Sequence, residues 1–164
     1  MRPLLFDIRG NLQASPLIEL SLDETELFFV KAFDKTSTRY ELFNEYKRYA
    51  YDLRQLIGQP FYQWLDGSFT SNVFSPNDID LVTFISHHEY SEKESLIDDR
   101  FSKWATSQYY SGLDAYTVWA YPADHKRFVL FQADYAYWHD WFGHTRYRRD
   151  RKRFTKGFIQ VNIN

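Results

Sequence analysis

The apolar residues of this chain change their spacing several times along the sequence, and this alternation limits the folds that the chain can adopt. In residues 37–57 apolar side chains recur every three or four positions, as on one face of a helix. Residues 61–65 and 78–85 are instead runs rich in aromatic and β-branched side chains, which favour strands. The alternation indicates an α/β (α+β) fold, with a small mixed sheet and flanking helices.

Local signals predict the remaining elements. Ser21 and Glu24 match a capping box, which predicts a short helix that ends near residue 33. Ser91 and Glu94 match the same pattern and predict the start of a helix that runs toward residue 108. Three further segments follow the two kinds of spacing, namely strands at 113–119 and 158–163 and an aromatic-striped helix at 125–142.

The length and composition narrow the class of protein. With 164 residues the chain is predicted to form one domain, 1–164, in which a helical part at 1–58 precedes a sheet-bearing part at 59–164. The charged fraction of 26% and the hydrophobic fraction of 44% are typical of globular proteins, and the lack of cysteine excludes disulfides and thiolate zinc sites. No apolar run approaches the roughly 20 residues of a membrane helix, and Asp7 interrupts any signal-peptide core. We therefore expect a cytoplasmic protein with no membrane partner.

A pair of carboxylates opens one of the predicted strands. Asp78 and Asp80 are two positions apart, so on a strand both side chains point to the same face. Two carboxylates this close repel each other unless a cation lies between them, and oxygen ligands of this kind suit Mg²⁺ or Mn²⁺. Asp114 lies between apolar residues on a separate predicted strand and would join the pair if the two strands are neighbours.

A glycine–serine turn precedes the pair by eleven positions. Gly67 allows the backbone to approach a ligand closely, and the Ser68 hydroxyl can bind a phosphate oxygen. Taken alone, each feature has a simpler interpretation, because acidic pairs at strand starts are often solvated and Gly-Ser turns are common. The combination of strand, turn, spacing and acidic pair is what favours a functional site.

This order of motifs resembles the DNA polymerase β-type nucleotidyltransferase superfamily. The resemblance lies in L-D-G-S at 65–68, followed by N-D-I-D-L-V at 77–82. A closer likeness is to small bacterial proteins of that fold, which share W-L-D-G-S-F (here 64–69), P-x-D-I-D (76–80), F-G-x-x-R (142–146) and K-G before an apolar strand (156–157). The likeness spans most of the chain and implies the nucleotidyltransferase fold.

The resemblance also implies roles for individual residues. Asp78, Asp80 and Asp114 would be catalytic residues that bind Mg²⁺ or Mn²⁺, with Asp114 as a base for the acceptor hydroxyl. Gly67 and Ser68 would bind the phosphates of a nucleoside triphosphate, most simply ATP. Many members place a basic residue or a glycine shortly after the serine, but this chain has F-T-S-N-V at 69–73. Two later cations, Arg146 and Lys156, are therefore the candidates for neutralising the triphosphate.

Three functions follow from these patterns. The first is an enzyme that transfers a nucleoside monophosphate to a hydroxyl of a protein, an RNA or a small molecule. The second is a non-catalytic regulatory protein of the same fold, for instance the antitoxin-like half of a bacterial toxin–antitoxin or phage-defence pair. The third is RNA binding through the basic stretch R-Y-R-R-D-R-K-R-F-T-K at 146–156, which a solvated loop explains equally well.

Overall fold

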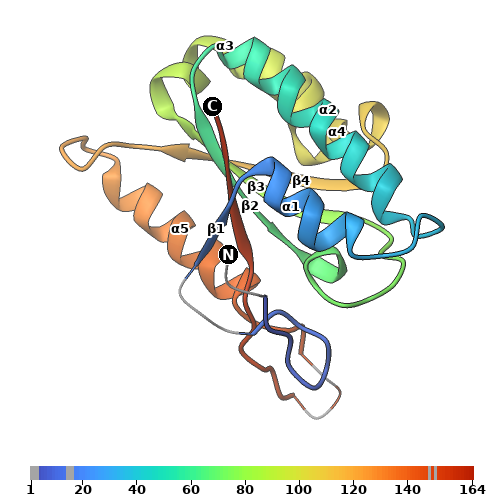
Figure 1. Ribbon diagram of the computed structural model, residues 1–164. Coiled ribbons are helices and arrows are strands. Elements are labelled where there is room, and N and C mark those ends of the chain that lie inside the picture. Colours follow the sequence, from blue (N-terminus) through green and yellow to red (C-terminus); the bar gives the residue numbers. More distant parts are fainter. Residues whose placement is uncertain (1–3, 14–16, 148, 150) are drawn as a thin grey trace.

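The computed structural model describes residues 4–13, 17–147, 149 and 151–164 (Figure 1). Within this part of the chain, a five-stranded sheet has the order β1-β5-β2-β3-β4. Its strands are β1 Ile18–Leu20, β2 Phe61–Asp66, β3 Ile79–Ser86, β4 Leu113–Ala120 and β5 Ile159–Ile163. β1 is parallel to β5 and β3 is parallel to β4, whereas β2 is antiparallel to both of its neighbours. The predicted mixed sheet is confirmed.

Helices cover both faces of the sheet. They are α1 Leu22–Glu26, the π-helical turn η1 Leu27–Lys31, α2 Arg39–Ile57, the 3₁₀ turn η2 Gly67–Thr70, α3 His87–Phe101, α4 Lys103–Tyr109 and α5 Phe128–Phe142. Figure 1 shows α1 to α4 on one side of the sheet and α5 alone on the other. None of the helices in the described residues combines the length and apolar character that crossing a membrane requires.

Local signals account for the first two helices. The Ser21 hydroxyl accepts a hydrogen bond from the Glu24 N–H while the Glu24 carboxylate accepts one from the Ser21 N–H, so the predicted capping box is present. Along α2, the predicted apolar face is buried against the sheet. Gly58 ends this helix with a positive φ of 78°, which glycine adopts without steric cost.

Two sequence-based expectations were wrong or incomplete. The helix expected to begin at Ser91 begins at His87, directly after β3, and the Ser91 hydroxyl donates to the carbonyl of His88 inside the helix. The helical segment also breaks at Ser102, whose extended backbone separates α3 from α4. In addition, the N-terminal part contributes β1, a three-residue strand whose pairing depends on β5 at the other end of the chain.

The alternation of side chains along β3 sets which face carries the acidic residues. Leu81 belongs to the core between the sheet and α2, whereas Val82 and Phe84 belong to the core beneath α5. Asp80 precedes Val82 by two positions and Phe84 by four, and side chains an even number of positions apart on a strand point to the same face. The Asp80 side chain therefore lies on the α5 side of the sheet. The candidate site therefore forms on the less covered face.

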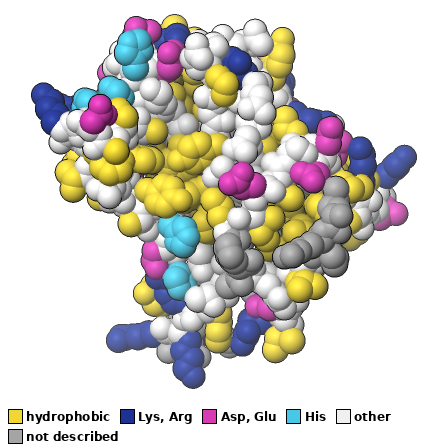
Figure 2. All heavy atoms as spheres, turned by 60° about the vertical axis from the view of Figure 1, so that its left-hand side comes forward, with side chains coloured by type: hydrophobic (Ala, Val, Ile, Leu, Met, Phe, Trp, Pro, Cys, Tyr) yellow, Lys and Arg dark blue, Asp and Glu magenta, His cyan; other side chains and the backbone are white. Residues whose placement is uncertain are grey.

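Helix α5 exposes much of its own apolar surface. Of the predicted stripe, Phe142 is buried, while Phe131 and Trp138 pack partly against the core. The outer side still exposes large hydrophobic residues, including Val129 and Leu130. Figure 2, which turns the left side of Figure 1 forward, shows hydrophobic side chains gathered into a patch on this face.

Candidate active site

Three aspartates form a row across neighbouring strands. Asp66 at the end of β2 is paired in register with Asp80 on β3, and Asp80 is paired with Asp114 on β4. Residues paired in this way point to the same face of a sheet, with Cβ atoms of neighbours about 5 Å apart. Asp78 lies directly before β3, so it stands next to the row rather than within a strand. The neighbouring strands required to bring Asp114 to Asp80 are thus present.

The row concentrates negative charge around Asp80. Burial, together with the nearby charges of Asp78, Asp66 and Asp114, raises the pKa of the Asp80 carboxyl to about 6. Arg146 is the cation that opposes this shift. A carboxylate held in this environment is disfavoured in its charged form, and a bound cation would relieve the repulsion.

The turn at Gly67 is built against this carboxylate. Gly67 has a φ of +80°, and a Cβ atom at this position would lie 2.0 Å from Oδ2 of Asp80. Glycine is therefore required both by the backbone conformation and by the contact with Asp80. The 3₁₀ turn η2 that follows places Ser68 on the cavity wall, and the Ser71 hydroxyl donates to the Ser68 carbonyl at 2.7 Å.

A buried arginine holds the same turn from behind. The Arg39 side chain is fully buried, and its guanidinium donates to the carbonyls of Phe69 at 2.6 Å and Ser71 at 2.8 Å. Further bonds reach the carbonyls of Phe29 and Val73, and burial lowers the pKa of Arg39 to about 10. Arg39 was not among the predicted site residues, although it lies four positions before Phe43 on the otherwise apolar stripe of α2.

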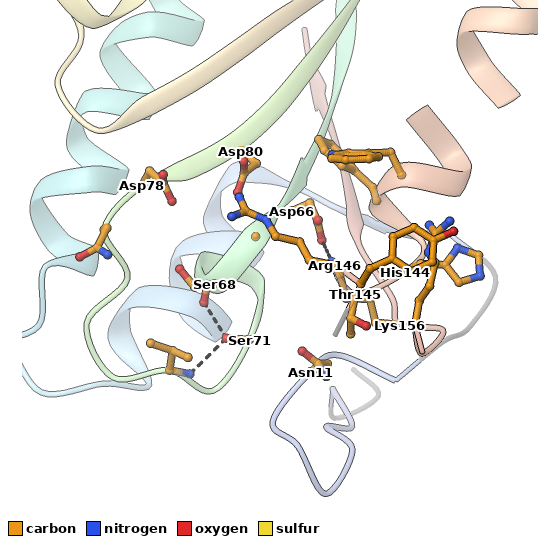
Figure 3. A pocket seen from close by; sticks show the side chains of 17 residues that line it. Asn11, Asp66, Ser68, Ser71, Asp78, Asp80, His144, Thr145, Arg146 and Lys156 are labelled. Carbon is orange, nitrogen blue, oxygen red and sulfur yellow. Dashed lines mark hydrogen bonds and ion pairs between the residues drawn. The ribbon is translucent and has the colours of Figure 1, made fainter. Parts of the chain in front are cut away.

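Two members of the row, Asp66 and Asp80, form one wall of a cavity of about 800 Å³ together with Asp78 (Figure 3). Four groups of residues line it. The acidic wall consists of Asp66, Asp78 and Asp80, and the Gly-Ser turn contributes Gly67 and Ser68. The two cations are Arg146 and Lys156, and the aromatic side consists of Trp141 and Tyr147. In Figure 3 the side chain of Arg146 extends across the cavity toward Asp80. Anionic and cationic groups thus face one another across a space large enough for a small ligand.

Lys156 makes a close ion pair with Asp66. The two side chains expose only 11% and 9% of their surface, although they are 90 residues apart in the sequence. Burial raises the pKa of Asp66, and the Lys156 ammonium acts in the opposite direction. Lys156 therefore lies on the cavity wall, where part of its charge is balanced by Asp66, the residue directly before the Gly-Ser turn.

The structure brings together almost all of the predicted site residues. Gly67, Ser68, Asp78, Asp80, Arg146 and Lys156 line the cavity. Asp114 stands beside Asp80 in the row, on the side away from the residues that line the cavity. Two positions of the basic stretch, Arg148 and Asp150, lie outside the described residues, as do residues 1–3 of the N-terminal segment.

The donor set determines how a divalent ion would fit. Among the described residues, no group of three or more His, Asp or Glu side chains is arranged so that it could hold a metal ion. Mg²⁺, however, is usually bound by one or two carboxylates together with water and substrate phosphates. Asp78 and Asp80, with Asp66 engaged by Lys156, fit this second mode, in which the substrate completes the coordination.

Comparison with known proteins places the chain in a family without giving it an activity. Searches of the curated proteins and of the solved structures found no match to the chain. Residues 4–162 match a family described as a family of unknown function (DUF6932), and this match covers nearly the whole chain. The chain therefore belongs to that family.

Proposed function

We propose that the protein is a metal-dependent nucleotidyltransferase, which moves a nucleoside monophosphate from a nucleoside triphosphate, most simply ATP, to a hydroxyl of a protein, an RNA or a small molecule. The observation that supports this proposal best is the row Asp66–Asp80–Asp114. Asp66 and Asp80 of this row, together with Asp78, line a cavity that also contains the Gly-Ser turn and two cations. Pyrophosphate is the second product.

Asp78 and Asp80 would hold Mg²⁺ or Mn²⁺ together with oxygens of the triphosphate. When bound, the ion neutralises charge on the phosphates and polarises the phosphoryl group under attack. Burial and the neighbouring carboxylates raise the pKa of Asp80 to about 6. This environment supports a cation at this position, because a bound cation would remove the repulsion among the carboxylates.

The remaining groups bind and orient the substrates. The Gly67–Ser68 turn, fixed from behind by Arg39, receives the phosphates, and Arg146 and Lys156 balance their charge. Asp114 lies beside Asp80 on the side away from the cavity. Its carboxylate accepts the proton of the attacking hydroxyl. Catalysis on this scheme comes from alignment of the reacting oxygens and from charge neutralisation, without a covalent enzyme intermediate.

The aromatic side of the cavity suits a nucleobase. Trp141 and Tyr147 line it with 52% and 66% of their surfaces exposed, so each has a face available for stacking. Stacking of a base on an aromatic side chain contributes about 1–3 kcal/mol and tolerates different bases. The aromatic side therefore supports binding of a nucleotide rather than of a simple polyphosphate.

The deciding experiment is transfer of label from each of the four α-³²P nucleoside triphosphates, with Mg²⁺ or Mn²⁺, to a cell lysate and to total RNA. Wild-type protein should label at least one acceptor, and Asp80→Asn should not. The matched control is Asp99→Asn, because Asp99 is an exposed aspartate on α3 outside the site. Absence of labelling under every condition would leave the regulatory alternative as the better hypothesis.

A further inference from the structure

Tyr116 carries a hydroxyl next to the carboxylate row. It follows Asp114 by two positions on β4, so both side chains lie on the same face of the sheet. Its ring packs on Trp138 of α5 with the ring centroids 4.5 Å apart, and the residue remains partly exposed. The phenol ring is thus packed against α5 beside the row and is partly exposed.

The hydroxyl of Tyr116 lies between a cation and a proposed base. Lys103 at the start of α4 donates a close hydrogen bond from its ammonium to the phenol oxygen. The phenol in turn donates to Oδ2 of Asp114 at 3.4 Å. A nucleophile that gives its proton to a carboxylate while a cation contacts its oxygen has the arrangement of an activated nucleophile, and such bonds often shorten only when substrate is bound.

The position of Tyr116 also fits attack from the acceptor side. Asp80 lines the cavity, whereas Asp114 and Tyr116 are outside its lining and continue the same sheet face beyond Asp80. A nucleotide in the cavity and the Tyr116 hydroxyl would therefore approach the row from different sides. In-line displacement needs this separation, because the attacking oxygen and the leaving pyrophosphate lie on opposite sides of the phosphorus.

The hydroxyls of three other tyrosines donate to groups away from the row. Tyr110 donates to Asp52, Tyr90 donates to Asp98, and Tyr46 donates to Gln63. Tyr116 differs in that its carboxylate partner is Asp114, the proposed base.

We propose that Tyr116 is an acceptor of the protein's own nucleotidyl transfer, an inference that rests on the proposed function. The phenol oxygen forms a bond to the α-phosphorus, and the bond from that phosphorus to the bridging oxygen of the β-phosphate breaks. Pyrophosphate leaves, and the phenol proton goes to the Asp114 carboxylate. The product is a nucleoside monophosphate joined to Tyr116 by a phosphodiester.

The test is the intact mass of the full-length protein after incubation with MgATP, and in parallel with MnATP and with the other three nucleoside triphosphates. We expect a mass gain of one nucleoside monophosphate, and peptide fragmentation should place it on Tyr116. Tyr116→Phe should lose the gain, whereas Tyr51→Phe should keep it, because Tyr51 is an exposed tyrosine on α2 outside the site. Lys103→Met should slow the modification by about tenfold, since it removes the cation from the phenol oxygen.

The outcomes separate this inference from the proposed function. A gain that maps to another residue, or that Tyr116→Phe retains, would overturn the assignment to Tyr116. Transfer to a lysate acceptor without any self-modification would also overturn it, while leaving the nucleotidyltransferase proposal in place. If MgATP neither labels any acceptor nor raises the melting temperature, both proposals fail. Mapping on the wild-type protein keeps the test valid even if Tyr116→Phe folds poorly.

Discussion

Replacing Asp80 with asparagine should change the stability of the protein in opposite directions with and without ligand. The folded environment raises the pKa of Asp80 from 3.8 to about 6. A shift of about two pKa units corresponds to about 3 kcal/mol, by which the charged carboxylate destabilises the ligand-free protein. Asp80→Asn removes this charge and should therefore stabilise the ligand-free protein.

The pH dependence gives the sign of this effect. Because the folded pKa is raised, the stability linked to protonation of Asp80 is fully present below about pH 4 and is lost as the pH rises through about 6. The advantage of Asp80→Asn over wild type should be close to zero near pH 4 and should level off at about 3 kcal/mol above pH 7. For a domain of 164 residues this equals an increase in melting temperature of about 6–12 °C.

Ligand should reverse the order of the two proteins. At a MgATP concentration of about 1,000 Kd, binding stabilises the wild type by about 4.1 kcal/mol, which exceeds the advantage of about 3 kcal/mol that Asp80→Asn has without ligand, while Asp80→Asn should gain almost nothing. The assay is urea unfolding at pH 5 and pH 7.5, in EDTA and in MgATP, with Asp99→Asn as the control. If Asp80→Asn is less stable than wild type in EDTA, or if its advantage is the same at both pH values, the pKa of Asp80 is not raised in the folded protein. If wild type and variant gain equally from MgATP, Asp80 is not a ligand of the bound ion.

Three further substitutions test other parts of the site. Gly67→Ala should destabilise the protein by about 1–3 kcal/mol and abolish the MgATP shift in melting temperature, because the new Cβ meets the Asp80 carboxylate at a positive φ; an unchanged melting temperature would show that the turn can move away. Trp141→Ala should weaken ATP binding about tenfold in calorimetry and leave tripolyphosphate binding unchanged, whereas equal losses for both ligands would argue against base stacking. Lys156→Met leaves Asp66 buried without its partner and should cost about 3–5 kcal/mol in urea unfolding, and adding Asp66→Asn should restore most of the loss; no restoration would mean that the aliphatic part of Lys156, rather than its charge, matters.

Local sequence patterns were sufficient for most elements of the fold. The helical stripe of α2, the capping box at Ser21 and the four longer strands are encoded by neighbouring residues, because periodicity and end signals act within a few positions. The same reasoning failed at Ser91, where a capping pattern lies inside a helix that begins directly from the end of β3. A local pattern can indicate a helix, but it does not fix where the chain enters it.

The components of the candidate site were also visible in the sequence. Gly67, Ser68 and the pair Asp78 and Asp80 stand close together in the chain, and their spacing predicted a common site. Arg146 and Lys156 were predicted from the need for cations, and both line the cavity.

Only the tertiary structure decided how these components meet. Strand register placed Asp66, Asp80 and Asp114 in one row, and the return of the chain after α5 brought Lys156 onto Asp66. The role of Arg39 likewise depends on carbonyls about 30 positions away in the chain. These relations come from long-range strand pairing and from the burial of charge, both of which are properties of the folded chain as a whole. The sequence by itself determined which residues could form a site, whereas folding determined the partner of each charge.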